Sequence, residues 1–387
     1  MPGALRIGVN ALFLIPGGVG GTEIYLRNLL GALAEIDNVN QYVIFLNEET
    51  AVAEPPLTPA APNFLAVSCG VRATNRPRRL LWEQLVLPVR AGACNLDVLF
   101  SPGFTSPLFT GGCPKVTVIH DLQHVRQPGN FGRVELAAWR ASVWISAHFS
   151  RQIITVSERS RRDIIEVYRL PKERVHVIRH GVEAAFSRAR SDPAVERAPL
   201  ERLGVGGWPY LLSVSTIHPH KNWARWLEAY RQLAGEGWPQ HLVIAGLRGK
   251  YSQELASSIE ESGLGDRVHP IGWVSREALL ALFKFADALV FPSTFEGFGM
   301  PVLEAMAAGV PVACSDIPPL REAAGGAAVF FDPHSAESIA AAVRRLLREE
   351  DLRRQLVDLG RENAAHFSWT RAAEQTLTVL RKPVKRN

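Results

Sequence analysis

Two glutamates with seven residues between them, Glu296 and Glu304, are well placed in this sequence to bind a polyhydroxylated ligand. A buried strand is predicted over residues 288–291 and a helix near Pro301, so a glycine-bearing turn over residues 297–299 joins the two. In parallel sheets, ligands bind beyond the carboxyl ends of strands, where free N–H groups of a helix's first turn can hold a diphosphate. One carboxylate can then accept hydrogen bonds from sugar hydroxyls and the other from ribose hydroxyls. The alternative is that Glu296 complements the helix dipole and Glu304 lies on a solvated helix face.

A lysine stands at a second junction between a strand and a helix. Lys221 follows a strand predicted over residues 210–214 and precedes an apolar-faced helix, in a stretch that also holds Ser215, His220 and Asn222. A lysine at such a junction can neutralise a departing diphosphate. A lysine at the start of an ordinary helix fits the same pattern, so the spacing alone leaves both interpretations open.

Two further features in the first half of the chain stand at strand ends. His120 and Asp121 end a strand predicted over residues 115–119, where an imidazole either contacts a ligand or is a hydrogen-bonded core residue. Residues 16–23 form a glycine-rich loop between the first strand and a helix. Glycines let the backbone approach a ligand and leave amide donors free, although a tight turn explains them about as well. The loop lacks the lysine followed by serine or threonine of nucleotide hydrolases.

Residues 291–333 form a long, continuous stretch that closely resembles the donor-binding half of the retaining glycosyltransferases of family 4, which have the GT-B fold. The stretches 218–222 and 17–21 resemble the same family, and the resemblance covers nearly the entire chain. It implies that the N-terminal domain holds the acceptor and the C-terminal domain holds a nucleoside-diphosphate sugar.

The resemblance also implies a role for each residue at a matching position. His120 is expected near the donor sugar, where its side chain or carbonyl steadies the developing oxocarbenium charge, and Asp121 orients it or meets the acceptor. Lys221 and Glu296 complete the implied catalytic set. The implied donor-binding set is Gly18, Gly20, Ser215, His220, Lys221, Asn222, Gly246, Glu296, Gly297, Phe298, Gly299, Met300, Pro301, Leu303 and Glu304.

One position departs from the family pattern. The family supplies an arginine and a lysine to the diphosphate, and this chain has His220 where the related subgroup has the arginine. The second positive charge is therefore expected to be absent or to depend on pH through the imidazole. The resemblance implies attack by the acceptor hydroxyl from the face that the diphosphate leaves, without a covalent carboxylate intermediate. The sequence holds no DxD cluster and the family requires no bound metal, so we expect neither a metal nor a cofactor.

Strand-like apolar runs alternate with helical patterns in both halves, which predicts parallel sheets covered by helices. A chain of 387 residues exceeds the size of most single cores, so two domains are expected. With the resemblance, this predicts an α/β protein of the GT-B fold, with two Rossmann-like domains facing across a cleft and a C-terminal helix crossing back to the first. The predicted parts are the N-terminal domain 1–182, a linker 183–207, the C-terminal domain 208–366 and the returning helix 367–387.

The composition predicts a cytoplasmic protein. No stretch approaches about 18 uncharged apolar residues, and no basic region followed by an apolar core opens the chain. The four cysteines are scattered without paired spacing, which fits a reducing compartment and argues against a disulfide framework or zinc site. The net charge of +5 accompanies no nucleic-acid-binding motif, so nucleic acid is not an expected partner.

The segment 72–90 is both basic and apolar, with five arginines around leucines and Trp82, and Glu83 as the opposing charge. Such a helix can lie on an anionic membrane surface, which would place the protein on the inner face of the cell membrane. Alternatively, it packs its apolar stripe into the N-terminal domain with solvated arginines outside. The sequence leaves these two interpretations open.

These observations predict a retaining, metal-independent hexosyltransferase that moves a sugar from a nucleoside diphosphate to a glycan or lipid-linked acceptor. GDP-mannose is the preferred donor because the 218–222 junction and the length resemble bacterial mannosyltransferases of surface polysaccharide synthesis; UDP- and dTDP-sugars remain open. The rival functions are a nucleotide-sugar epimerase or hydrolase of the same fold and a non-catalytic assembly subunit. His120, Lys221, Glu296 and Glu304 argue against the last of these.

Overall fold

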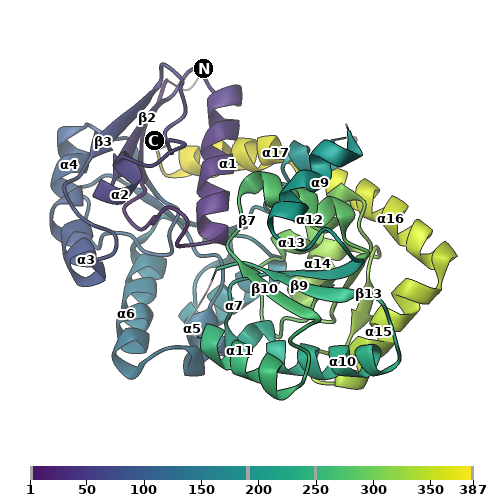
Figure 1. Ribbon diagram of the computed structural model, residues 1–387. Coiled ribbons are helices and arrows are strands. Elements are labelled where there is room, and N and C mark those ends of the chain that lie inside the picture. Colours follow the sequence, from purple (N-terminus) through teal and green to yellow (C-terminus); the bar gives the residue numbers. More distant parts are fainter. Residues whose placement is uncertain (1–2, 189–191, 248–250, 385–387) are drawn as a thin grey trace. The chain divides into compact units, whose positions relative to one another are not determined.

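The computed structural model describes residues 3–188, 192–247 and 251–384 (Figure 1). The chain forms two compact units: the first comprises Met1–Gly181 and Ser368–Asn387, and the second comprises Val182–Phe367. Each unit contains one fully parallel sheet with helices packed around it, which confirms the predicted pair of Rossmann-like α/β domains. The chain passes between the units twice, after Gly181 and after Phe367.

The first unit has a seven-stranded sheet of order β3-β2-β1-β4-β5-β6-β7. β1 pairs with β2 on one side and β4 on the other, so the strand order reverses there, as it does where doubly wound sheets bind ligands. The strands are β1 (Arg6–Asn10), β2 (Gln41–Leu46), β3 (Phe64–Ser68), β4 (Val98–Ser101), β5 (Lys115–Val118), β6 (Gln152–Thr155) and β7 (Val175–Val177).

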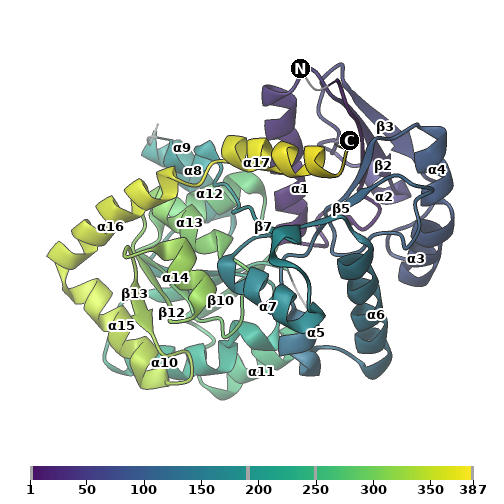
Figure 2. The same ribbon diagram turned by 180° about the vertical axis from the view of Figure 1, so that it is seen from behind.

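Helices from both ends of the chain cover this first sheet. The last helix, α17 (Trp369–Arg381), packs beside α1 (Gly21–Ile36), as both ribbon views show (Figures 1 and 2). Both helices bury an apolar stripe, which explains why they pair. The other helices are α2 (Glu48–Ala51), α3 (Arg76–Leu85), α4 (Leu87–Ala93), α5 (Gln123–Arg126), α6 (Arg133–Phe149) and α7 (Glu158–Tyr168), with 3₁₀ turns at Pro128–Asn130, Lys172–Arg174 and Lys382–Val384.

The second unit has a six-stranded sheet of order β10-β9-β8-β11-β12-β13. Its strands are β8 (Tyr210–Val214), β9 (His241–Ala245), β10 (Val268–Gly272), β11 (Ala288–Phe291), β12 (Val312–Ser315) and β13 (Val329–Phe331). Its helices are α8 (Ala184–Ser187), α9 (Pro193–Arg202), α10 (Trp223–Gly235), α11 (Ser252–Glu261), α12 (Arg276–Phe285), α13 (Met300–Ala308), α14 (Pro318–Ala324), α15 (Ala336–Arg348) and α16 (Glu350–Ala365), with a 3₁₀ turn at Pro219–Lys221.

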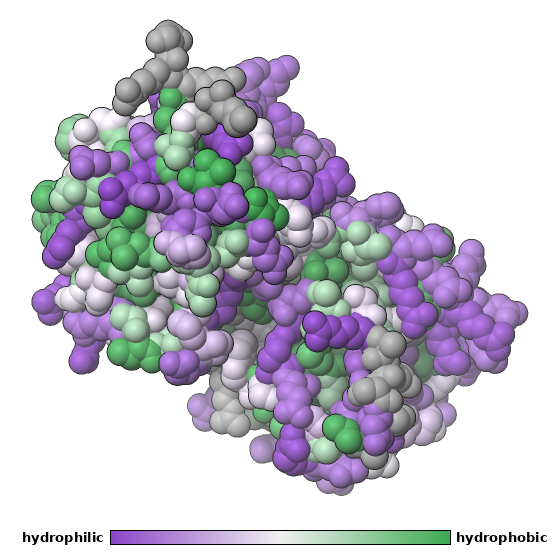
Figure 3. All heavy atoms as spheres, turned by 90° about the horizontal axis from the view of Figure 1, so that it is seen from above, coloured by the Kyte–Doolittle hydropathy of each residue, from purple (hydrophilic) through white to green (hydrophobic). Residues whose placement is uncertain are grey.

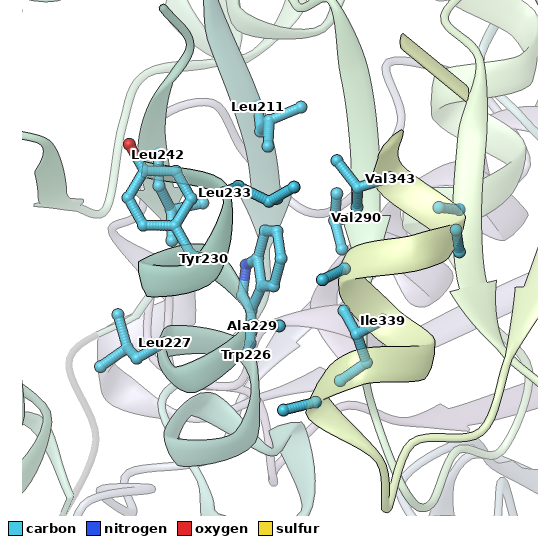
Figure 4. Close-up of a cluster of buried hydrophobic side chains, with 14 of the residues drawn as sticks. Leu211, Trp226, Leu227, Ala229, Tyr230, Leu233, Leu242, Val290, Ile339 and Val343 are labelled. Carbon is cyan, nitrogen blue, oxygen red and sulfur yellow. The ribbon is translucent and has the colours of Figure 1, made fainter. Parts of the chain in front are cut away.

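The core of the second unit lies between α10, α15 and the sheet. Trp226 of α10 is fully buried, and Val290 of β11 lies on the same side of its ring as Ile339 and Val343 of α15 (Figure 4). The Trp226 indole N–H donates to Ser213 Oγ at 3.2 Å, so this large ring is buried without an unmet polar group. This packing fixes α10 and the loop that precedes it.

The segment 183–207 differs from the expected linker. Its described part contains α8 and α9, and both pack against α12 within the second unit. Lys284 of α12 pairs with Glu196 of α9 at 2.7 Å, and the two side chains are 12% and 14% exposed. At least this one charge of the apparent linker is therefore enclosed in helix packing, which a search for apolar periodicity does not detect, whereas Arg197, Glu201 and Arg202 of α9 are exposed.

The segment 72–90 folds as α3 and α4, and its polarity differs from the expected core-packed arrangement. Glu83 is fully buried and lies 3.9 Å from the guanidinium of Arg79, while Leu81 and Leu85 are 62% and 68% exposed. Burial raises the pKa of Glu83 even though Arg79 opposes that shift. The prediction that the apolar side chains face the core is wrong for Leu81 and Leu85. These two leucines are exposed, because the inner face of α3 carries the Arg79–Glu83 ion pair.

The surface of the molecule mixes polar and apolar side chains. In Figure 3, apolar patches interrupt the polar surface of the first unit on the face seen from above. Scattered exposed apolar residues are normal for proteins in water. In the part of the chain that the structure describes, no helix combines the length and apolar character needed to cross a bilayer.

Candidate active site

Two loops of the second unit meet at the carboxyl ends of neighbouring strands. β8 pairs with β11, so the loop after Val214 and the loop after Phe291 leave the sheet side by side. Thr294 N–H donates to the carbonyl of His220 at 2.8 Å, and the Asn222 side chain donates to the carbonyl of Pro292 at 3.1 Å. These bonds hold the two loops as one structure.

Lys221 and Glu296 form an ion pair between the two loops. Lys221 Nζ lies 2.6 Å from Glu296 Oε1, and the side chains are only 13% and 12% exposed. The ammonium group also lies 5.5 Å from the centre of the Phe291 ring, within reach of a cation–π contact. The two residues expected to meet the diphosphate and the sugar are therefore direct partners of each other.

Asn222 shapes the start of the helix after Lys221. Its backbone is left-handed, with φ of 62°, and it precedes the first residue of α10. Its side-chain amide donates to the carbonyls of both Pro292 and Pro333. Because its amide hydrogens are already used, Asn222 positions Lys221 and the neighbouring loop, and it is less suited to bind the donor directly.

Ser215 and Gly246 lie together at the same edge of the sheet. Ser215 N–H donates to Ala245 and Gly246 N–H donates to Gly272, which ties the ends of three adjacent strands together. A Cβ at Gly246 would lie 2.0 Å from the Ser215 carbonyl oxygen, and its φ of 146° is one that side chains disfavour. Only glycine fits this close approach. The sequence alone shows a glycine after an apolar run and does not reveal the packing constraint.

The turn 297–299 leads into α13, which begins at Met300 with Pro301 in its first turn. This agrees with the strand-to-helix junction predicted from the sequence. Phe298 and Leu303 are buried, at 4% and 1% exposure, and the Phe298 ring lies 5.9 Å from that of Phe367. Their side chains are core groups, so any contact that they make with a donor is through the backbone.

Glu304 lies on α13 among buried residues and is itself 7% exposed. The solvated-face interpretation is therefore wrong. Burial raises the pKa of Glu304 to about 7, Arg276 opposes this shift and Glu183 adds to it. Arg276 is paired with Glu183 at 2.7 Å, so the positive charge of one guanidinium acts on two carboxyl groups, Glu183 and Glu304. Glu304 consequently changes charge near neutral pH.

His220 does not supply a second cation. Its side chain is 8% exposed, and its ring is stacked on His218 at 5.6 Å and meets the Phe295 ring edge-on at 6.4 Å. Burial, followed by the charges of Lys221 and His218, lowers the pKa of His220 to about 2. Of the two expected outcomes, the pH-dependent histidine cation is therefore wrong and the absence of a second positive charge at this position fits, because burial beside a lysine keeps the imidazole neutral.

His120 lies beyond the carboxyl end of β5 in the first unit and is 6% exposed. Its Nε2 lies 3.0 Å from the carbonyl oxygen of Pro102. A carbonyl only accepts, so Nε2 carries the hydrogen and Nδ1 carries the lone pair. Burial lowers the pKa of His120 to about 4, so the ring is neutral at pH 7 and presents an acceptor at Nδ1. Asp121 beside it accepts a bond from Gln123 N–H at 2.9 Å at the start of α5.

The glycine-rich loop is partly tied to α1. Gly17 N–H donates to Glu23 Oε2 and Gly18 N–H donates to the carbonyl of Ile15, both at 2.8 Å. The expectation of a free amide donor is therefore wrong at Gly18. Gly20 caps the N-terminus of α1, and Glu23 in the first turn pairs with Arg27 at 2.8 Å. Glu23 organises this loop, a role that the sequence analysis missed because its partners are backbone groups.

Comparisons with known proteins identify the family of this chain. Residues 19–186 match the model described as Glycosyltransferase Family 4, and residues 202–363 match Glycosyl transferases group 1. The O-antigen chain mannosyltransferase B of Escherichia coli is 30% identical over 273 residues, which are 69% of this chain and 70% of the relative. This chain belongs to glycosyltransferase family 4. The resemblance seen in the sequence is thereby confirmed.

Other similar proteins agree with the family and the fold. The O-antigen chain mannosyltransferase RfbU of Salmonella typhimurium is 27% identical over 87% of this family 4 glycosyltransferase and 90% of its own length. The sucrose-phosphate synthase structure from Thermosynechococcus elongatus superposes with a TM-score of 0.78 at 19% identity, covering 98% of this chain and 99% of the other. Neighbours of this kind confirm the GT-B fold.

In this family 4 glycosyltransferase, each unit gathers its own part of the predicted set. The second unit brings Ser215, His220, Lys221, Asn222, Gly246 and residues 296–304 to one edge of its sheet. The first unit places His120 and Asp121 after β5 and the glycine-rich loop before α1. Within the described ranges, no three His, Cys, Asp or Glu side chains cluster as metal ligands. No signal in the sequence pointed to Glu23, which holds the glycine-rich loop, or to Glu183 and Arg276, whose charges act on Glu304.

Proposed function

We propose that this glycosyltransferase transfers a hexose, with retention at the anomeric carbon, from GDP-mannose to a glycan or lipid-linked acceptor. The observation that carries the proposal is the enclosed Lys221–Glu296 pair at the carboxyl edge of the second sheet, with the buried Glu304 on the following helix. The choice of mannose is supported by the O-antigen mannosyltransferases among the relatives. A UDP- or dTDP-sugar is the alternative donor.

Donor binding exchanges one partner for another at Lys221. The ammonium group is neutralised by Glu296 before binding, and a diphosphate offers it a more highly charged partner. When Lys221 turns to the phosphates, Glu296 is released and accepts hydrogen bonds from the sugar hydroxyls. Glu304 accepts bonds from the ribose hydroxyls. The ion pair thus keeps both groups in place without leaving a charge unpaired while the site is empty.

Transfer then proceeds at the face that the diphosphate leaves. The bond between the anomeric carbon and the phosphate oxygen breaks, the acceptor oxygen bonds to that carbon, and the acceptor proton passes to the leaving phosphate. Lys221 stabilises the charge that grows on the phosphate. His120 is neutral, so it acts as a hydrogen-bond acceptor through Nδ1 beside the developing positive charge and takes no proton.

The donor is tested by thermal unfolding and by transfer. GDP-mannose at about 100 times its Kd is expected to stabilise the protein by about 2.7 kcal/mol, whereas UDP-glucose and dTDP-glucose leave the Tm nearly unchanged. GDP should be released only when a bacterial glycolipid extract is added. Stabilisation by UDP-glucose alone would replace the donor, and release of free mannose without the extract would favour a hydrolase.

Activity is expected to persist in excess EDTA. In the proposed mechanism, the diphosphate charge is met by Lys221 and backbone amides instead of a divalent cation. The measurement is the initial rate of transfer with and without EDTA after exhaustive dialysis, with Mg²⁺ and Mn²⁺ added back as the control. Activity that disappears in EDTA and returns only with one of these metals would contradict the metal-independent mechanism.

We also propose that the first unit rests on an anionic lipid surface, through a patch formed by α3, α4 and the loop after β4. Leu85 and Phe109 are 68% and 71% exposed. The Gln84 side chain joins the two elements, since it accepts a bond from Leu108 N–H at 2.8 Å and donates to the carbonyl of Ser106 at 3.3 Å. The apolar residues of the patch are Leu81, Leu85, Val89, Leu108 and Phe109.

Positive charge borders the same patch. Arg78 and Arg90 are exposed, and Arg76 is exposed as well, although it pairs with Glu135 at 3.0 Å. Arg79 does not contribute, because its guanidinium lies inward beside Glu83. Apolar side chains bordered by arginines match a bilayer whose interior is apolar and whose headgroups are negative. This location at the cytoplasmic face of a membrane suits a lipid-linked acceptor.

Vesicle sedimentation tests this surface. Replacing Arg76, Arg78 and Arg90 by glutamine is expected to weaken binding to phosphatidylglycerol vesicles about 10²-fold, given about 1 kcal/mol for each arginine at an anionic surface. Leu85→Ser with Phe109→Ser should weaken binding at all salt concentrations, whereas Val39→Ser, an exposed site elsewhere on the first unit, should not. Unchanged sedimentation of both patch variants, or dimerisation through the patch without vesicle binding, would overturn the proposal.

A further inference from the structure

A chain of ring contacts in the first unit runs from the last helix to His120. Trp369, the first residue of α17, is stacked on His180 with ring centres 5.6 Å apart. His180 lies 5.7 Å from His120 in an edge-on contact. Tyr25 of α1 touches all three rings, at 6.0 Å from Trp369, 4.9 Å from His180 and 4.9 Å from His120. The three residues around His120 come from three distant parts of the sequence.

The outer end of this chain is held firmly. Trp369 is 8% exposed and Tyr25 is 1% exposed. A Cβ on Gly181 would lie 2.2 Å from the Trp369 backbone nitrogen, so the polypeptide backbone after His180 packs directly against the start of α17. On the other side of this segment, Val182 N–H donates to the carbonyl of Phe367 at 3.1 Å. The position of Trp369 is therefore fixed by backbone contacts on both sides.

We propose that Trp369 is a positioning residue for His120, acting through His180 and Tyr25. The inference rests on the proposed function, in which His120 Nδ1 meets the donor sugar. The hydrogen bond from Nε2 to Pro102 fixes one atom of the ring, and the ring can still turn about that bond. Contacts on its faces and edges must set the direction of Nδ1. Tyr25 and His180 provide two of them, and Phe104, whose ring centre lies 5.1 Å away, provides a third that does not involve Trp369.

Loss of Trp369 is expected to lower kcat and to leave donor binding unchanged. Without the indole, His180 loses its stacked neighbour and Tyr25 one of its contacts, so both can shift and His120 can rotate. Small misplacements of a catalytic group can cost up to about 10²-fold in rate. In the proposed function, Lys221 and Glu304 of the second unit hold the diphosphate and the ribose of the donor, and these ring contacts include neither residue.

A double-mutant cycle in the full chain tests the inference. We expect Trp369→Leu to lower kcat about tenfold at constant donor KM, and Trp369→Phe to restore most of the loss. In a His120→Ala background, Trp369→Leu should change kcat less than about twofold, because a residue that acts through His120 has no effect once His120 is gone. Trp144→Leu, an exposed tryptophan on α6 of the same unit, is the matched control and should behave like the wild type in both backgrounds.

The outcomes separate the inference from the proposed function. Wild-type activity of His120→Ala would show that His120 takes no part in the reaction, which would contradict the role of His120 in the proposed function. An impaired His120→Ala in which Trp369→Leu still lowers kcat tenfold would overturn only the positioning role. Should Trp369→Leu not fold, Trp369→Phe takes its place in the cycle, with a smaller expected loss that again vanishes without His120.

A second measurement needs no substrate. In the ¹⁵N spectrum of labelled imidazoles, His120 should give the widely separated pair of signals of one neutral tautomer, identified by their loss in His120→Ala. Trp369→Leu should shift or broaden these signals, because a ring that turns about its bond to Pro102 places Nδ1 in several environments. Trp144→Leu should leave them in place. Unchanged His120 signals in Trp369→Leu would contradict the inference.

Discussion

Replacing Lys221 by alanine is expected to lower kcat about 10²- to 10³-fold, the range observed when one electrostatic donor is removed from an active site. The charge of Lys221 is needed most when the bond to the diphosphate breaks. His220 beside it is neutral, with its pKa lowered to about 2 by burial and by Lys221 itself, so it cannot replace the lost charge. His220→Phe should therefore leave the pH–rate profile unshifted.

The control for Lys221→Ala lies in the same unit. Lys284 forms a similarly enclosed ion pair with Glu196, at 2.7 Å compared with 2.6 Å for Lys221 and Glu296. Lys284→Ala removes a comparable pair away from the proposed site, so it should lower the Tm and leave kcat unchanged. Equal losses of kcat in the two variants would show that Lys221 acts through stability alone.

Replacing Glu304 by alanine is expected to raise the donor KM by about 10- to 100-fold, since hydrogen bonds to a charged group contribute about 1.5 to 3 kcal/mol. kcat should change much less, because the ribose is remote from the bond that breaks. The comparison is a full donor titration at saturating acceptor. A variant with a normal KM would remove Glu304 from the donor site.

The pKa of Glu304, raised to about 7 by burial, gives this affinity a pH dependence of known sign. Below pH 7 the carboxyl is protonated and neutral, and above it the carboxylate accepts the ribose hydrogen bonds. Charged acceptors bond about twice as strongly as neutral ones, so donor affinity should rise severalfold as pH increases through 7. A falling affinity over this range would contradict the assigned role.

Glu304→Gln isolates this titration. The amide has the shape of the protonated acid and does not ionise, so the variant should keep the weak low-pH affinity at every pH. Glu254→Gln, on the exposed side of α11 in the same unit, should retain the wild-type profile. If the pH dependence survives in Glu304→Gln, another group is responsible for it.

The strand-to-helix junctions of the candidate site could be predicted from the sequence because they are local. An apolar run followed by glycines and a proline indicates a strand, a turn and a helix within about fifteen residues, and α13 begins at Met300 as expected. The positions of Lys221 and Glu296 at strand ends follow from the same patterns. Their mutual contact does not, because it depends on β8 and β11 being neighbours in the sheet.

Charge states and long-range packing were beyond the reach of the sequence. His220 looks like a titratable group, and its enclosure between His218 and Phe295 makes it neutral. Glu83 looks like an exposed counter-charge on a basic helix and is buried instead. In each case, the charge state depends on neighbours and burial that exist only in the folded structure. No periodic pattern in the sequence indicates these contacts.

The first unit is interrupted in sequence by the whole of the second, and this gives the two units different degrees of autonomy. Val182–Phe367 is one continuous stretch, so its sheet can close as soon as that stretch has left the ribosome. The first unit must wait for Ser368 and the residues after it, because α17 covers α1. Synthesis from the N-terminus therefore completes the second unit before the unit that begins the chain. An exchange of domains between relatives must carry α17 together with residues 1–181.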